Sequence, residues 1–290
     1  MPSNAVVLRN TPVPTRFGKA YGPWAVVTGA SDGIGREFAE RLAEARLNVV
    51  LVARQKEILD GLASDLERRF AIETRVIAAD LSKREGIDTL EKGVADLPVG
   101  LLVAAAGFGT SGDFIEQSLD AELEMIEVNC SAVAALAHHF GNRFAKQRRG
   151  GLVLLSSLLA FQGVPHAANY AATKAYVQSL AEGLRAELAP LGVDVIASAP
   201  GPIHSGFAAR ARMNMGMGLS PKAVASATLD ALGKQGTVRP GWLSKFLEGS
   251  LATLPRVLRV RAMAAVMRGM TQHHGGPSSS EPHTLEEGSR

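Results

Sequence analysis

Six short apolar runs alternate with longer stretches of helical periodicity, and this alternation limits the fold more than any other feature of the sequence. Short runs that are apolar throughout are typical of strands buried on both faces of a sheet. Strands that alternate with helices form a parallel sheet with right-handed crossovers. We therefore expect an α/β fold, a doubly wound parallel sheet flanked by helices, with strands at residues 24–28, 48–53, 74–79, 99–105, 151–157 and 193–199.

The length and composition favour one main domain. A chain of 290 residues, 46% of them apolar, buries a full α/β core without a second domain. We expect this domain over residues 23–240, after an extension of little periodicity over residues 1–22. Apolar and basic helices are expected over residues 241–270, and the composition of residues 271–290 favours a disordered tail.

Charge and cysteine content argue against several classes of protein. Lys and Arg total 31 against 28 Asp and Glu, and no block of like charges suggests a nucleic-acid-binding arm. Cys130 is the only cysteine, so no internal disulfide forms, and its apolar surroundings favour a buried thiol. Neither a signal-peptide core in the first twenty residues nor a bilayer-spanning apolar stretch is present. We expect a cytoplasmic protein that does not bind nucleic acid.

A glycine-rich turn joins the first apolar run to the helix that follows. Its sequence is Gly29-Ala-Ser-Asp-Gly-Ile-Gly35. Glycines let backbone amides approach a pyrophosphate closely, and a helix N-terminus adds partial positive charge. An ordinary strand-to-helix turn is the alternative, but the surrounding pattern makes it the weaker one. This Rossmann-type turn predicts cofactor contacts from Gly29, Ser31, Asp32, Gly33, Ile34 and Gly35.

Arg54 ends the second run, where an NAD-selective fold usually carries an acidic residue for the ribose hydroxyls. An arginine there accommodates a 2′-phosphate, which favours NADP(H), and Arg36 is placed to support the same phosphate. Two solvated arginines are the alternative. Further contacts are expected where later strands end, at Asp80, Leu81, Ala106, Gly107, Pro200 and Gly201. Asp80 either accepts from the adenine amino group, caps the helix beginning near Ser82, or does both.

Tyr170 and Lys174 stand one helical turn apart, so their side chains share a face. A fixed ammonium lowers the pKa of a phenol from its ordinary value near 10, so that the phenol exchanges a proton with a carbonyl or alcohol oxygen. Ser157 closes the fifth run, where strand ends face the ligand crevice of a parallel sheet. An accidental surface pair is the alternative, and the glycine turn weakens it.

Asn129 falls among apolar residues of a long helix expected over about 119–146. A buried amide needs hydrogen-bond partners, so Asn129 is either satisfied by its neighbours in the packing or part of a polar relay.

The order and spacing of these motifs resemble the classical short-chain dehydrogenase/reductase family. The resemblance implies a catalytic tetrad in which Tyr170 donates or accepts the proton and Ser157 polarises the substrate carbonyl. It also implies that Lys174 binds the nicotinamide ribose and lowers the tyrosine pKa, while Asn129 holds a water relay. Family members usually form dimers or tetramers, so the resemblance implies a homodimer or homotetramer.

The family's loop after the sixth strand implies that Ile203 and Ser205 contact the nicotinamide carboxamide. The resemblance also implies that Tyr170 and Lys174 contact the cofactor. Ala104 and Ala105 depart from the pattern, because the family usually carries two asparagines there. The N-terminal stretch 21–24 and the long C-terminus suggest a branch similar to 3-oxoacyl-CoA and hydroxysteroid reductases.

The segment 203–219 carries methionines beside glycines, which favours a lid over an apolar substrate; the alternative is that it only fills gaps in the fold. Residues expected on the opposite wall are Leu158, Leu159, Phe161 and Val164. The basic helices of residues 241–270, divided at Pro255, either pack on the domain or a dimer interface, which we favour, or contact a membrane surface. No histidine spacing suggests a metal site.

The sequence thus predicts an NADP(H)-dependent oxidoreductase that transfers a hydride between the nicotinamide and a carbonyl or secondary alcohol of an apolar substrate. The alternatives are a non-catalytic NADP-binding sensor or scaffold of the same fold, and a membrane-surface protein that uses its C-terminal helices.

Overall fold

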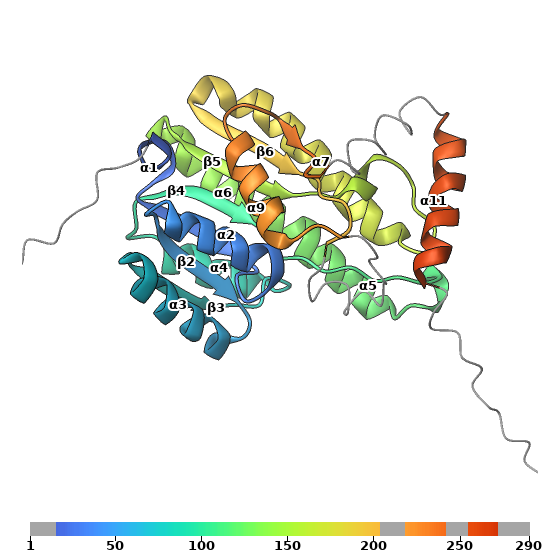
Figure 1. Ribbon diagram of the computed structural model, residues 1–290, viewed down its shortest axis with the longest axis horizontal. Helices are drawn as coiled ribbons and strands as arrows, with labels where there is room; N and C mark the ends of the chain where they lie inside the picture. The colour runs from blue at the N-terminus through green and yellow to red at the C-terminus, as the bar shows by residue number, and fades with distance from the viewer. Residues whose placement is uncertain (1–15, 204–217, 242–254, 272–290) are drawn as a thin grey trace, which may run out of the picture.

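A seven-stranded parallel sheet forms the centre of the molecule (Figure 1). The computed structural model describes residues 16–203, 218–241 and 255–271. The strand order is β3-β2-β1-β4-β5-β6-β7, and the order reverses between β1 and β4, where open sheets of this kind bind their ligands. The strands are β1 (Trp24–Thr28), β2 (Asn48–Ala53), β3 (Thr74–Ala78), β4 (Val99–Ala104), β5 (Gly150–Leu155), β6 (Val193–Ser198) and β7 (Thr237–Val238).

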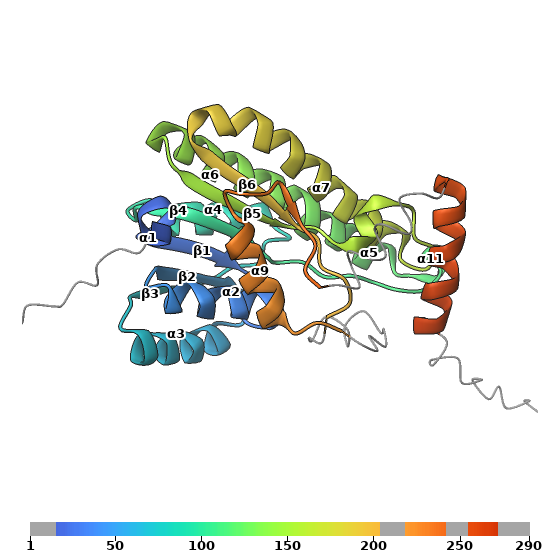
Figure 2. The same ribbon diagram turned by 45° about the horizontal axis from the view of Figure 1, so that its top comes forward.

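Helices cover both faces of the sheet (Figures 1 and 2). One layer holds α4 (Arg84–Gly93), α6 (Ala132–Gln147) and α7 (Ala168–Leu188), which pack on side chains such as Val26 and Leu102. The other holds α2 (Gly33–Glu44), α3 (Lys56–Phe70) and α9 (Pro221–Ala231), which pack on alternate residues such as Val27 and Val103. Strand residues are apolar on both faces because each face is buried. The structure confirms the doubly wound parallel sheet.

The expected strands differ from the observed ones at their carboxyl ends. β5 ends at Leu155, so Ser157 lies in the segment after the strand rather than in it. β7 was not expected, because two paired residues leave no recognisable apolar run; Thr237 pairs with Ala197 and Val238 with Ser198.

The long helix expected over residues 119–146 is not continuous. It consists of α5 (Leu119–Ile126), a π-helical turn (Glu127–Ser131) and α6. Asn129 lies in the π-helical turn with its side chain fully buried. Such insertions are frequent at functional sites, and apolar periodicity does not reveal a single extra residue in a turn.

The end of the expected N-terminal extension is a short helix, α1 (Arg16–Tyr21), at the amino end of the sheet (Figure 1). The phenol of Tyr21 donates a hydrogen bond to Oδ2 of Asp194 at 2.8 Å. Burial and this carboxylate raise the pKa of Tyr21 above its ordinary value. A six-residue helix is too short to give a periodic signal, and residues 1–15 lie outside the described part.

The remaining long helix is α11 (Arg256–Thr271), which stands at the end of the molecule where the strands finish (Figures 1 and 2). Within the described ranges, no helix is both long and apolar enough to cross a membrane.

Candidate active site

A cavity of about 670 Å³ lies at the carboxyl ends of the strands. It runs from the turn between β1 and α2 to the inner side of α11. Apart from Arg36, the expected cofactor residues within the described ranges line it, namely Gly29, Ser31, Asp32, Gly33, Ile34, Gly35, Arg54, Asp80, Leu81, Ala106, Gly107, Tyr170, Lys174, Pro200, Gly201 and Ile203. Ser157 lines it too, whereas Ser205 lies outside the described residues.

The glycine turn packs directly on the loop that follows β4. Gly29 has a φ of +67°, and a Cβ there would stand 2.9 Å from the backbone of Ala106. Only glycine fits this conformation and this space without strain. The turn leads into α2, so the amide-rich N-terminus of a twelve-residue helix lies at the cavity. Backbone donors and partial positive charge at this place suit a pyrophosphate.

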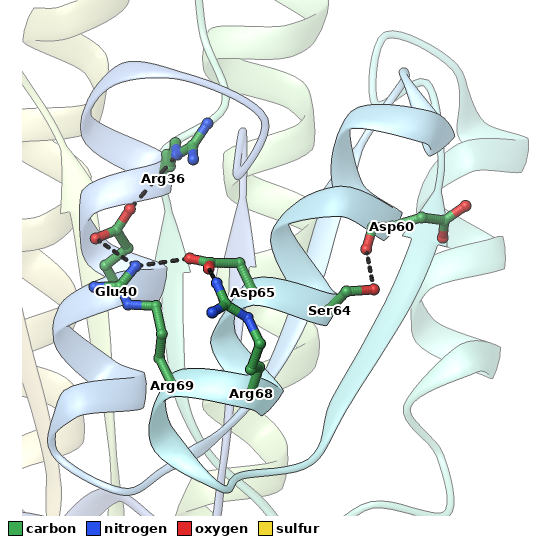
Figure 3. Close-up of polar contacts among 7 residues, drawn as sticks. All are labelled: Arg36, Glu40, Asp60, Ser64, Asp65, Arg68 and Arg69. Atoms are coloured by element: carbon green, nitrogen blue, oxygen red, sulfur yellow. Dashed lines mark hydrogen bonds and ion pairs between the residues drawn. The ribbon is translucent and has the colours of Figure 1, made fainter.

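Arg54 lies at the cavity edge, but Arg36 does not line it. An Nη1 atom of Arg54 is 3.4 Å from Oε1 of Glu124 on α5, and Glu124 also lines the cavity. Arg36 instead pairs with Glu40 on its own helix at 3.5 Å, and Glu40 also reaches Arg69 on α3 (Figure 3). Of the two arginines expected near a 2′-phosphate, the structure therefore brings one to the cavity.

Asp80 shapes the turn after β3. Its Oδ1 atom accepts hydrogen bonds from the amide of Ser82 at 3.1 Å and from the Ser82 hydroxyl at 2.8 Å. Partial burial acts to raise the pKa of Asp80, but these bonds and nearby positive charges outweigh it and hold the pKa below its ordinary value. The carboxylate therefore shapes the turn before α4 and does not cap that helix, whose N-cap residue is Lys83 and which has no side-chain capping bond. The adenine contact stays a prediction.

Ser157, Tyr170 and Lys174 meet in the middle of the cavity. The Ser157 hydroxyl lies close enough to the Tyr170 phenol to act on its pKa, and all three residues are more than nine-tenths buried. The ammonium of Lys174 donates to the carbonyl of Leu155 at 2.9 Å and stands 5.7 Å from the centre of the Tyr170 ring. A phenol, a hydroxyl and an ammonium at one point of a cavity can bind and protonate a carbonyl oxygen.

Burial controls the protonation of this group. It raises the pKa of Tyr170 to about 12, and the hydrogen bond with Ser157 opposes part of that rise. Burial also lowers the pKa of Lys174 to about 8. The pKa of Tyr170 is thus raised rather than lowered in this structure, because removal of the phenol from water is the larger effect, and a lowering by Lys174 stays a prediction.

Asn129 is satisfied entirely by protein groups. Its Oδ1 atom accepts from the amide of Phe108 at 3.1 Å, and its Nδ2 atom donates to the carbonyl of Phe108 at 2.9 Å and to Thr173 Oγ1 at 3.1 Å. A Cβ at Gly107 would stand 2.8 Å from this Oδ1 atom, so the amide also fixes the loop after β4. The structure shows the packing role of Asn129, and the water relay stays a prediction.

One end of the cavity is lined by α11, which the sequence predicts on the domain or at a dimer interface. Met263 and Met267 are buried against Phe108, Val164 and Tyr170, and Met263, Val266 and Met267 line the cavity. The sequence signal for this position is the spacing of Met263 and Met267, which lie one helical turn apart among arginines and so form one apolar face of the helix.

The expected opposite wall is only partly as predicted. Leu158 and Leu159 line the cavity, whereas Phe161 lies beneath the guanidinium of Arg239, whose carbon is 4.4 Å from the ring centre. Ile203 pairs with Leu219, but residues 204–217, most of the expected lid, lie outside the described part. In the described ranges, no three His, Cys, Asp or Glu side chains gather as a metal site would require.

Comparison with known proteins identifies the family. A model described as short chain dehydrogenase matches residues 23–216, more than half of the chain. The chain belongs to the short-chain dehydrogenase family. The assignment agrees with the parallel sheet and with the hydroxyl, phenol and ammonium at the cavity centre.

The relatives of this chain include proteins named as a 3-oxoacyl-CoA reductase and as a hydroxysteroid dehydrogenase-like protein. It is 33% identical over 250 residues to a very-long-chain 3-oxoacyl-CoA reductase of Meyerozyma guilliermondii, covering 80% of this chain and 73% of that one. It is 36% identical over 185 residues to hydroxysteroid dehydrogenase-like protein 1 of Gallus gallus, covering 63% of this chain. The match spans only 56% of the chicken protein.

Solved structures show the same fold. One of 7beta-hydroxysteroid dehydrogenase has a TM-score of 0.80 and 26% identity, covering 86% of this chain and 99% of that one. A short-chain dehydrogenase from Sphingobium yanoikuyae in complex with NADPH has a TM-score of 0.73 and 28% identity, covering 81% and 97%.

Proposed function

We propose that this dehydrogenase is an NADPH-dependent reductase of apolar ketones, working in reverse as an alcohol dehydrogenase. The observation that carries the proposal is the meeting of Ser157, Tyr170 and Lys174 in one cavity, set between a glycine turn and an apolar wall. NADPH, when bound, supplies the hydride that reaches the carbonyl carbon. The phenol of Tyr170 gives its proton to the carbonyl oxygen, so that ketone, NADPH and a proton become alcohol and NADP⁺.

Each residue of the tetrad has a distinct task in this proposal. Ser157 and Tyr170 bind the same carbonyl oxygen, which orients the carbonyl and polarises it. The raised pKa of Tyr170 keeps the phenol protonated at neutral pH, as the reducing direction requires. Lys174 holds the nicotinamide ribose, and Asn129 holds the Phe108 loop and Thr173 on α7, so the cavity keeps its shape.

NADP(H) is the favoured cofactor because the cavity edge carries Arg54 at the end of β2 and no carboxylate at that position. Arginine binds a 2′-phosphate through charge and paired N–H donors. The NADPH complex of the Sphingobium relative gives independent support. Ile203 and Ser205 are proposed to contact the carboxamide of the nicotinamide.

The substrate class follows from the wall that α11 builds. Met263, Val266 and Met267 face the cavity together with Leu159, and flexible methionine side chains adapt to irregular apolar shapes. The relatives named as 3-oxoacyl-CoA reductase and 7beta-hydroxysteroid dehydrogenase act on substrates with large apolar parts, as their names state. We propose steroid-like or long-chain ketones.

The test is a fluorescence titration with NADPH and NADH, followed by NADPH consumption with steroid ketones and 3-oxoacyl thioesters. We expect tighter binding of NADPH than NADH and turnover with at least one of these ketones. Tight NADPH binding without turnover on any of them would favour a cofactor sensor, and failure to bind either nucleotide would overturn the proposal.

The oligomeric state is proposed from exposed apolar side chains. Leu119, Leu123 and Ile126 of α5 and Tyr176 of α7 are between one third and two thirds exposed. Apolar side chains gathered on neighbouring helices support a homodimer or homotetramer. Light scattering after gel filtration tests this, and a monomer at all concentrations would contradict it.

A further inference from the structure

A buried carboxylate that the mechanism does not use lies close to the catalytic tyrosine. Glu122 of α5 is only 3% exposed. Its Oε1 atom accepts from Thr110 Oγ1 at 2.6 Å, and its Oε2 atom accepts from Asn169 Nδ2 at 2.7 Å. The same Nδ2 atom is 3.0 Å from the backbone carbonyl of Glu122. A carboxylate is costly to bury, and this one is held by donors from two other segments.

The contacts of Glu122 repeat those of Asn129. Asn129 lies seven residues later on the same helical run and joins Thr173 of α7 to Phe108 of the loop after β4. Glu122 joins Asn169 of α7, one turn before Thr173, to Thr110 of the same loop. We call the contacts of Glu122 the first rung and those of Asn129 the second rung.

Each rung holds α7 at the residue just before a catalytic side chain. Asn169 precedes Tyr170, and Thr173 precedes Lys174. The first turn of α7 needs such a contact, because the N-cap residue Ala167 makes no side-chain capping bond. The loop at the other end of both rungs continues from Gly107, which lines the cofactor part of the cavity.

A further contact joins the same loop to the segment before α7. The amide of Gly112 donates to the carbonyl of His166 at 2.9 Å, and Nδ1 of His166 is 2.8 Å from Asp113 Oδ1. This pair is more exposed than the first rung, so it is expected to hold the loop less firmly.

We propose that Glu122 is a positioning residue. Through Asn169 and Thr110 it fixes the phenol of Tyr170 relative to the loop after β4. The inference rests on the proposed reductase function. A displacement of about 1 Å at a reacting group costs up to about a hundredfold in rate, so loss of the first rung acts on kcat. The glycine turn between β1 and α2 lies elsewhere, and the second rung still holds the cavity-lining residue Phe108, so we expect the affinity for NADPH to stay nearly unchanged.

The test compares Glu122→Ala, Glu122→Gln and Asn169→Ala with the wild type. We expect kcat for ketone reduction to fall about tenfold or more in the two alanine variants, with the Kd of NADPH changed by less than about twofold. Glu122→Gln retains most of the activity, because its amide oxygen still accepts and its amide nitrogen donates to Thr110. Asp120→Asn, an exposed carboxylate of the same helix, is the matched control.

A swapped pair separates positioning from simple loss of stability. Asn169→Asp sets two carboxylates against each other and is expected to lower kcat more than Asn169→Ala. Adding Glu122→Gln to Asn169→Asp again pairs an amide donor, now at position 122, with a carboxylate acceptor, now at position 169. We expect kcat to recover by about fivefold or more relative to Asn169→Asp alone. This rescue also decides the matter if Glu122→Ala fails to fold.

Amide hydrogen exchange of residues 168–174 provides a readout without turnover. The alanine variants are expected to exchange faster there, with unchanged exchange in β1. The inference is overturned if the folded variants keep the wild-type kcat and the wild-type exchange. It is also overturned if kcat falls in parallel with NADPH affinity and thermal stability and the double variant shows no rescue. A wild type without turnover refutes the reductase function, while exchange still decides the first rung.

Discussion

Replacement of Arg54 by alanine tests the cofactor preference most specifically. Arg54 lines the cavity at the end of β2, and its side chain is 54% exposed. A hydrogen bond to a charged group contributes about 1.5 to 3 kcal/mol, and solvent at an exposed site favours the lower value. We therefore expect Arg54→Ala to raise the Kd of NADPH about tenfold, since about 1.4 kcal/mol is a factor of ten.

The ion pair between Arg54 and Glu124 refines this estimate. Its atoms are 3.4 Å apart and both side chains are more than one third exposed. Such pairs contribute at most about 1 kcal/mol, which corresponds to about fivefold. Glu124→Gln releases Arg54 for the 2′-phosphate, so the Kd of NADPH is expected to fall by up to about fivefold.

Fluorescence titration of NADPH and NADH measures both effects in the same way. NADH lacks the 2′-phosphate, so its Kd is expected to stay within about twofold in both variants. Arg36→Ala is the matched control, because Arg36 pairs with Glu40 (Figure 3). Arg36 also does not line the cavity. An unchanged Kd of NADPH in Arg54→Ala, or an equal rise for NADH, would remove Arg54 from the cofactor site.

Three further predictions concern the substrate wall, the lysine and the buried amide. Met267→Ala removes apolar contact that contributes about 1.5 kcal/mol to substrate binding. We therefore expect the KM of a bulky ketone to rise about tenfold in initial-rate assays. An equal loss of NADPH affinity would contradict the placement of α11 at the substrate. Burial lowers the pKa of Lys174 from 10.5 to about 8, so the unfolded chain binds more protons between these values and stability rises with pH. Urea unfolding should show about 1 kcal/mol more stability at pH 9 than at pH 8 relative to Lys174→Met, and no difference would show that the ammonium is not desolvated. Asn129→Ala leaves both backbone groups of Phe108 without their side-chain partner. We expect urea unfolding to show that the free energy of unfolding falls by about 2 to 4 kcal/mol. A fall below about 1 kcal/mol would mean that water replaces the amide.

The sheet was predictable from the sequence because its strands are buried on both faces. Val26, Leu51 and Leu102, for example, are fully buried and lie in short apolar runs. Such runs are typical of strands that are buried on both faces of a parallel sheet. The cavity followed from the sheet, since parallel strands bring their carboxyl ends to one edge. Residues as distant in sequence as Gly29 and Tyr170 therefore meet there.

Other parts of the site depend on packing that leaves no periodic signal. The π-helical turn at residues 127–131 adds one residue to a helix, and the first rung depends on three polar residues from separate segments. The position of α11 over Tyr170 is set by contacts of Met263 and Met267 that spacing alone does not specify. The pKa of Tyr170 could not be predicted either, because it depends on how far the phenol is removed from water.

The central claim is tested most directly by turnover of Tyr170→Phe beside the wild type, measured as NADPH consumption with the ketone that the wild type reduces best. The substitution keeps the ring and removes the hydroxyl that faces Ser157 in the cavity. We predict a fall in kcat of about a hundredfold to ten-thousandfold, with NADPH affinity changed by less than about twofold. Turnover of the variant near the wild-type rate would contradict the account, because the proton would then come from another group.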